Sequence, residues 1–257
     1  MKLLSKSELK QSFRNNRGLW MIMTGVVCFF VVVMTAVMPG MIDSGGAAGQ
    51  GRPGGMGNVT MLEMYRNMIF GMMGIILMLI YAIATGNKLV VNEVDRGTMS
   101  FTLNTPVTRR QVIFSKALFY IVSLVTMCVT IGLVASGMSA LMGVGLDYGK
   151  FWLLISGFTL YGLAVSGICF AASCWFDKSG QALMIGAGLP VAFFVLNSLS
   201  SLDGLGFLKY FSLNTLFDTA AVVSGGSFAG AFIAMFAIAM ALYIAGINKF
   251  LKKDLPL

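Results

Sequence analysis

Six long apolar runs, separated by shorter polar segments, dominate the pattern of this 257-residue chain. The runs cover residues 19–38, 68–85, 117–144, 151–175, 182–199 and 228–247, and none of them contains Lys, Arg, Asp or Glu. A helix needs about 20 apolar residues to cross the hydrocarbon core of a membrane, because its backbone hydrogen bonds have to be satisfied within the segment. The pattern therefore predicts an all-α integral membrane protein, with six transmembrane helices in a single domain over residues 1–257.

The composition excludes an ordinary soluble domain. Charged residues make up 11% of the chain and hydrophobic residues 57%, whereas roughly 25% of the residues in soluble domains are charged. The chain has no histidine, and its four cysteines, Cys28, Cys128, Cys169 and Cys174, all lie within the apolar runs. Cysteines in such runs behave as small apolar residues. We therefore expect neither a disulfide framework nor a metal site.

Basic residues divide unequally between the two sides of the membrane that six crossings define. Fourteen lie in the terminal segments, the 86–116 loop and the loop after the fourth run: Lys2, Lys6, Lys10, Arg14, Arg17, Lys88, Arg96, Arg109, Arg110, Lys116, Lys178, Lys249, Lys252 and Lys253. The other four are Arg52, Arg66, Lys150 and Lys209. Loops rich in Lys and Arg stay in the cytoplasm, so both termini and the 86–116 loop are predicted to be cytoplasmic. The net charge of +8 then reflects topology and contact with anionic lipid headgroups, and no nucleic-acid partner is expected.

The segment before the first run has the pattern of an interfacial helix. Leu9 and Phe13 lie on one face at helical spacing, while Arg14 and Arg17 lie elsewhere around the helix. The alternative is a frayed basic tail that only sets the orientation. We expect the run at 19–38 to be a retained first span and not a cleaved signal peptide, because it is longer than the apolar region of such a peptide and no convincing A-x-A site follows it.

Two features of the runs predict local structure. Gly186, Gly188 and Pro190 should weaken or kink the fifth span. Small residues recur at four-residue spacing at Gly132, Ser136 and Ala140, and again at Gly162 and Ser166, which lets helices approach closely.

The connection between the fifth and sixth runs, residues 202–227, is more apolar than an ordinary loop. Its aromatic residues include Phe207, Tyr210, Phe211 and Phe217. Aromatic side chains favour the membrane interface, and the connection is too short to cross and return as two full spans. We expect a re-entrant or interfacial helical pair on the outer side.

Catalysis and ion-coupled transport both lack the residues that they need. Intramembrane hydrolysis requires a nucleophile with a base, a metal or paired carboxylates, and ion-coupled carriers place ionisable residues near the midplane. All ten carboxylates of this chain fall outside the six runs, so no catalytic residue is predicted. If the protein does work, we expect a separate subunit to supply the energy.

The 86–116 loop is charged and carries an ordered series of turn and capping residues. Thr105 and Pro106 form a good N-cap and first-turn pair, which predicts that a helix begins there and continues into the third span. The preceding segment can form a short helix across the membrane plane. It offers apolar contacts to a partner from Met99, Phe101 and Leu103, and ionic contacts from Glu93, Asp95 and Arg96. Such a helix, joined rigidly to two spans, would pass force from a cytoplasmic protein into the membrane.

This loop resembles that of the ABC-2 type transporter permeases. Glu93 with Gly97-Thr98 matches E-x-x-x-G-T, and Leu103, Pro106 and Arg109 match L-x-x-P-x-x-R, followed by Lys116. The six spans with cytoplasmic ends are also similar to that family. The outer segment looks like the family's re-entrant region, although residues 211–214, Phe-Ser-Leu-Asn, stand where a proline is often found.

The resemblance implies a non-catalytic permease subunit in a bacterial plasma membrane. Residues 93–104 would act as a coupling helix in a groove of a separate ABC ATPase, present in two copies, which would hold the ATP and Mg²⁺. This chain has no G-x-x-x-x-G-K-[ST] phosphate loop of its own. A second copy of the chain or a related permease would complete the membrane part.

The resemblance also implies export. The 20 Met and 20 Phe residues favour amphipathic or hydrophobic cargo, with peptides fitting best, because Met-rich surfaces adapt to different shapes. Drugs, lipids and sodium ions are the alternative cargo classes. The competing class is a non-transport assembly or regulatory protein on the same scaffold.

Overall fold

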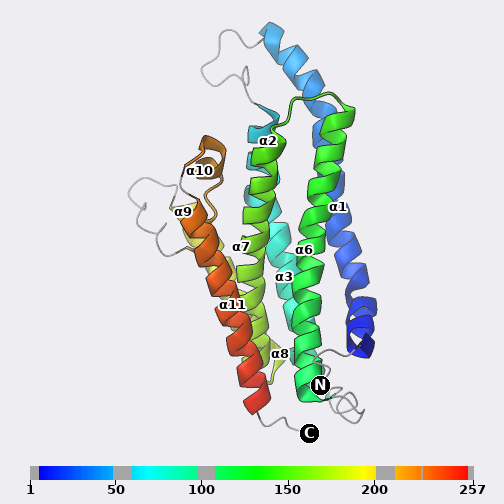
Figure 1. The fold of residues 1–257 in the computed structure, drawn as a ribbon, viewed down its shortest axis with the longest axis vertical. Coiled ribbons are helices and arrows are strands. Elements are labelled where there is room, and N and C mark those ends of the chain that lie inside the picture. The colour runs from blue at the N-terminus through cyan, green and yellow to red at the C-terminus, as the bar shows by residue number, and fades with distance from the viewer. Residues whose placement is uncertain (1–5, 49–59, 98–107, 201–211, 227, 254–257) are drawn as a thin grey trace.

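A bundle of long helices makes up the protein in the computed structural model (Figure 1). The structure describes residues 6–48, 60–97, 108–200, 212–226 and 228–253, with side chains at 8–37 in the first range. The helices are α1 (Lys6–Ala48), α2 (Met61–Met68), α3 (Met72–Leu89), α4 (Val91–Asp95), α6 (Arg109–Leu141), α7 (Tyr148–Trp175), α8 (Ser179–Gly186), α9 (Gly188–Leu199), the 3-10 helix η2 (Leu213–Leu216), α10 (Thr219–Ser224) and α11 (Ala229–Lys252). Six helical segments of the described chain are long and apolar enough to cross a membrane, which confirms the predicted all-α membrane architecture.

Helix α7 lies at the centre of the bundle. It packs against α3, α6, α8 and α11, while α1 packs against α6 and α3. Because α7 has neighbours on several sides, its small residues, such as Gly157 and Gly162, are buried together with large ones such as Phe158. Figure 1 shows α1 beginning, α6 beginning and α11 ending at one end of the bundle, as an even number of crossings requires.

The interfacial segment and the first span form one continuous helix, α1, where the sequence suggested two elements. Gly18 stands at the boundary between the two predicted elements, but a single glycine weakens a helix without ending it, and residue 18 is helical. Leu9 is partly buried against the core, whereas Phe13 is 61% exposed and both Arg14 and Arg17 are exposed. The side chains that α1 buries in these turns are the polar Glu8, Ser12 and Asn16, so the interfacial role of the segment stays a prediction.

The second span begins four residues later than the apolar run suggested. Helix α2 ends at Met68, and α3 begins at Met72 with extended backbone at Gly71. A Cβ at Gly71 would lie 1.9 Å from the Asn67 carbonyl oxygen, so only glycine fits this tight connection. The hydrophobic pattern could not show the break, because the residues on both sides of it are apolar.

The fifth span is broken where glycine and proline predicted a weakness. Helix α8 ends at Gly186 and α9 begins at Gly188. Pro190 has no N–H to donate to the Gly186 carbonyl four residues earlier. That carbonyl oxygen instead accepts a hydrogen bond from the Cys169 thiol of α7, with an Sγ–O distance of 3.1 Å. A neighbouring helix thus satisfies the backbone group that proline leaves open.

The described part of the outer connection, 212–226, packs into the bundle. Phe217 is buried and stacks on Tyr161 of α7, with ring centroids 6.1 Å apart. The Tyr161 hydroxyl donates to Asn214 Oδ1 at 2.7 Å, so the short helices η2 and α10 are anchored to α7. Phe207, Tyr210 and Phe211 lie outside the described residues.

Glycines at helix contacts provide a test of this packing. A Cβ at Gly86 of α3 would lie 2.7 Å from Cys169 Cβ, whereas a Cβ at Gly137 of α6 would meet nothing within 4 Å. We expect Gly86→Ala to destabilise the protein by about 1–3 kcal/mol, because α3 and α7 would have to separate. Gly137→Ala should be neutral or stabilise by up to ~1 kcal/mol, since alanine favours helix. Thermal unfolding in detergent micelles measures both, and equal effects would contradict the described α3–α7 contact.

Candidate functional site

Helix α4 forms the start of the 93–104 segment and is fixed to the end of the bundle. It follows α3 after a break at Val90, and Val91 and Val94 are both buried. Helix α4 packs against α3 and α8. Its polar residues therefore lie where the ends of several spans meet.

A buried lysine joins α4 to the third span. Lys116 of α6 is only 1% exposed, and its ammonium group contacts the Glu93 carboxylate of α4 and donates to the Leu89 carbonyl oxygen at 2.6 Å. Glu8 of α1 is also buried, and its carboxylate is attracted by Lys116 and repelled by Glu93. A charge removed from water requires compensation, and the Lys116–Glu93 ion pair, which supplies it, fixes α4 to α6.

The carboxylate of Asp95 joins α4 to the fifth span. Its Oδ2 accepts from the backbone N–H of Ser179, the first residue of α8, at 3.1 Å. The N-cap of α8, Lys178, makes no side-chain cap of its own, so Asp95 caps this helix from outside. Asn87 of α3 strengthens the junction, because its side-chain amide exchanges hydrogen bonds of 2.9 and 3.1 Å with the Ser179 hydroxyl.

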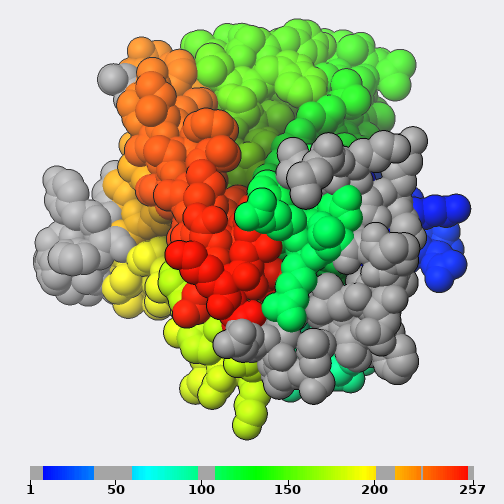
Figure 2. Space-filling view, turned by 60° about the horizontal axis from the view of Figure 1, so that its bottom comes forward, coloured from blue at the N-terminus to red at the C-terminus, as the bar shows by residue number. Residues whose placement is uncertain are grey.

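A third junction lies where α11 ends beside the start of α6, as Figure 2 shows. Lys253 pairs with Asp177 at 2.7 Å and donates to the Trp175 carbonyl oxygen at 3.1 Å. Arg109 donates to the Lys253 carbonyl oxygen at 3.3 Å. The end of α11 is therefore connected to α6 and α7 at the same end of the bundle as α4.

Helix α6 begins at Arg109, and not at Thr105 and Pro106 as the sequence suggested. Its N-cap is Thr108, whose hydroxyl accepts from the Gln111 N–H while the Gln111 side chain accepts from the Thr108 N–H. This reciprocal capping box satisfies two backbone donors at once, which explains why the helix begins here. Thr105 and Pro106 themselves lie outside the described residues.

Glu93 and Asp95 were predicted to form ionic contacts with a partner, and in the structure each carboxylate also has a contact within this chain. Glu93 contacts Lys116, and Asp95 accepts a hydrogen bond from the Ser179 N–H. Glu93 is 27% exposed and Asp95 is exposed, so their contact with a partner stays a prediction. Arg96 is exposed, as a partner contact requires.

The chain leaves α4 through a left-handed residue. Gly97 has φ +68° and donates its N–H to the Val94 carbonyl oxygen at 3.0 Å. Residues other than glycine seldom adopt this conformation, which accounts for glycine in the motif. The predicted contact residues that follow, Thr98, Met99, Phe101 and Leu103, lie outside the described residues.

Five members of this site were not predicted as site residues: Glu8, Asn87, Asp177, Ser179 and Lys253. Lys116 was noted only as the end of the motif, although a lysine at the border of a span needs a compensating partner. The need of Lys116 for an acidic partner is the signal in the sequence that points to its ion pair with Glu93. Ser179 carries no comparable signal, because its capping partner comes from a distant segment.

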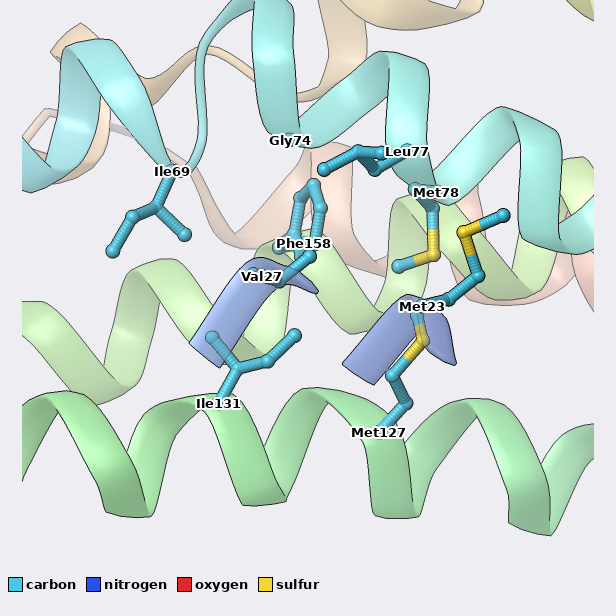
Figure 3. Close-up of a pocket in the computed structure, with 9 residues that line it drawn as sticks. All are labelled: Met23, Val27, Ile69, Gly74, Leu77, Met78, Met127, Ile131 and Phe158. Carbon is cyan, nitrogen blue, oxygen red and sulfur yellow. The ribbon is translucent and has the colours of Figure 1, made fainter. Parts of the chain in front are cut away.

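In the described interior of the bundle, polar side chains such as Thr35, Tyr65 and Ser139 hydrogen-bond to one another. Figure 3 shows a small hollow among α1, α3, α6 and α7, where the side chains of Met23, Met78 and Met127 lie together near Phe158. Its walls are apolar, so the hollow has no group that would bind an ion. Among the residues that the structure describes, no three His, Cys, Asp or Glu side chains are grouped so as to hold a metal.

Comparison with known families gives a match over nearly the whole chain. The model of the family described as "ABC-2 family transporter protein" matches residues 3–255. The matched range includes all six membrane-spanning segments and α4. Comparison with curated proteins gives no match.

Proposed function

The chain belongs to the ABC-2 family of transporter proteins, and we propose that it is the permease subunit of an ATP-driven exporter. The family makes it a membrane component of an ABC transporter, which works with an ABC ATPase. The observation that supports a coupling role for the 93–104 segment is the double attachment of α4. Glu93 connects it to Lys116 of α6, and Asp95 connects it to Ser179 of α8.

In this proposal, ATP-driven closure of the ATPase moves residues 93–104, and the two attachments pass the movement to different spans. The ion pair pulls on α6 directly. The Asp95 cap pulls on α8, which is separated from α9 by the break at Ala187. A broken helix can change its angle at such a point without disturbing both halves, so α8 can move while α9 keeps its outer contacts.

The partner would carry the chemistry. ATP and Mg²⁺ would bind to two copies of the ATPase, since this chain contains no phosphate-loop motif. Two permeases, either identical or related, would enclose the route between them. Both termini would lie in the cytoplasm of a bacterial cell, as the distribution of Lys and Arg favours.

For the cargo, we propose amphipathic or hydrophobic molecules, with peptides as the leading class. The six apolar runs carry no ionisable Lys, Arg, Asp or Glu side chain, which favours such cargo over sodium ions. Drugs and lipids share the same chemistry and are the next candidates. A regulatory protein on the same scaffold would also carry α4 but would move no cargo.

Purification and reconstitution test the proposal. An affinity-tagged chain should co-purify with an ABC ATPase, and the complex in vesicles should export an amphipathic peptide only when ATP is present. Peptide movement without ATP would contradict the permease assignment, and so would ATP turnover without any transport across a panel of peptides, drugs and lipids. The second result would favour the regulatory alternative.

A further inference from the structure

A groove between α1 and α6, at the end of the bundle where α1 begins, combines an apolar wall with a single cationic group. It has a volume of about 250 Å³ and is lined by Phe13, Arg17 and Trp20 of α1 and by Phe119, Val122, Ser123 and Thr126 of α6. Figure 1 shows these two helices side by side. Aromatic rings supply three of the seven lining residues, and such rings collect at the boundary between hydrocarbon and headgroups.

The polar side chains of Trp20, Ser123 and Thr126 in the wall of the groove already donate hydrogen bonds within the protein. The Trp20 indole donates to the Ser123 carbonyl oxygen at 2.9 Å, the Ser123 hydroxyl donates to the Tyr120 carbonyl oxygen at 2.9 Å, and the Thr126 hydroxyl donates to the Val122 carbonyl oxygen at 2.8 Å. The groove therefore presents a largely hydrocarbon surface to a ligand. A polar cargo would find few hydrogen-bonding groups there.

Arg17 is the exception. Its side chain is exposed, and within the described part of the chain it has neither an ion pair nor a hydrogen-bond partner. It stands two residues before the apolar run that begins at Leu19, and a basic side chain at the end of a span is expected to reach the lipid headgroups. Arg14, one turn earlier, is also exposed and adds a second positive charge.

We propose that this groove is a binding site for one anionic phospholipid. The headgroup phosphate pairs with Arg17, and part of one acyl chain lies along Phe13, Trp20 and Phe119. Arginine suits this role because its planar guanidinium binds phosphate oxygens in a bidentate manner. The required ligand has one anionic end and one hydrocarbon end, and an anionic phospholipid meets both requirements. The proposal does not depend on transport or on an ATPase.

Tryptophan fluorescence offers a direct test, because the chain has only three tryptophans. The full-length variant Trp152→Phe/Trp175→Phe reports on Trp20 alone. It is placed in vesicles in which either the phosphatidylglycerol or the phosphatidylcholine has brominated acyl chains. Brominated chains quench the fluorescence of a nearby tryptophan. We expect brominated phosphatidylglycerol to quench Trp20 about fivefold more than brominated phosphatidylcholine does. Roughly one surface cation gives an anionic lipid this preference over a neutral one. When Arg17→Gln is added to this variant, the two brominated lipids should quench Trp20 about equally.

Matched controls separate the site from general lipid contact. Arg66→Gln, which removes an arginine at the other end of the bundle, should leave the preference unchanged. Equal quenching by both lipids, or a preference that survives Arg17→Gln, would overturn the proposal. Quenching by neither lipid would also overturn it, since cargo or a second copy would then cover the groove. Should the double tryptophan variant fail to fold, native mass spectrometry of the wild-type chain and Arg17→Gln measures the retained anionic lipid, and equal retention would again contradict the site.

Discussion

Replacing Gly97 with proline is expected to reduce ATP-driven transport by at least about tenfold, a rate change that corresponds to roughly 1.4 kcal/mol. Proline fixes φ near −65°, whereas Gly97 has φ +68°. Proline also removes the N–H that donates to the Val94 carbonyl oxygen. The chain must therefore leave α4 in a different direction, which displaces the segment that is proposed to meet the ATPase. Transport in vesicles, with ATP hydrolysis measured in parallel, tests this expectation.

Gly143 provides a matched control for the same substitution. It has φ +65° and donates its N–H to the Ala140 carbonyl oxygen, so proline causes the same local damage at the opposite end of α6. Gly143→Pro should keep most of the transport activity. If both variants lose activity equally, the loss comes from general destabilisation and not from coupling.

Neutralising Lys116 is expected to have the largest effect on stability. Lys116→Met leaves the Glu93 carboxylate, which is 27% exposed, and the buried Glu8 without their cation. Removing one partner of a buried ion pair costs about 3–5 kcal/mol, and the partial exposure of Glu93 favours the lower end of that range. The double variant Lys116→Met/Glu93→Gln should recover most of the loss, because it leaves fewer charges without a partner. Thermal unfolding in detergent micelles measures each variant.

An exposed ion pair serves as the comparison for Lys116. Lys150 and Asp147 lie 3.9 Å apart and are 46% and 51% exposed. Lys150→Met should therefore cost less than about 1 kcal/mol. The proposed role of Lys116 fails if its loss is no more destabilising than that of Lys150, or if the double variant is as unstable as the single one.

Hydrophobic patterning predicted the spans well because the membrane imposes one strong rule on their length and polarity. The break at residues 186–190 was also predictable, since glycine and proline act on their own backbone. The start of the second span was not, because the tight turn at Gly71 interrupts a run that is apolar on both sides. The sequence offers two capping patterns for the start of α6, and the structure has Thr108 as the N-cap with Gln111. The spacing of these two residues is that of a capping box, so the sequence contained the signal for this start.

The candidate site was only partly predictable. The motif located Glu93, Gly97 and Lys116, because the spacing of such residues can be read along one segment. The capping of Ser179 by Asp95 joins residues 84 positions apart, so only the packing of α4 against α8 brings them together. Glu93 and Asp95, which the sequence predicts to contact a partner, thus also connect α4 to α6 and α8.

Site-specific photocrosslinking from position 96 tests the central claim most directly. Arg96 is exposed beside α4, and Lys150 is an exposed position at the opposite end of the bundle. A benzophenone amino acid is placed at one position or the other in the assembled transporter complex. The account predicts an adduct with the ATPase from position 96 and none from position 150. An intact complex that gives no ATPase adduct from position 96, or gives one from position 150, would contradict it.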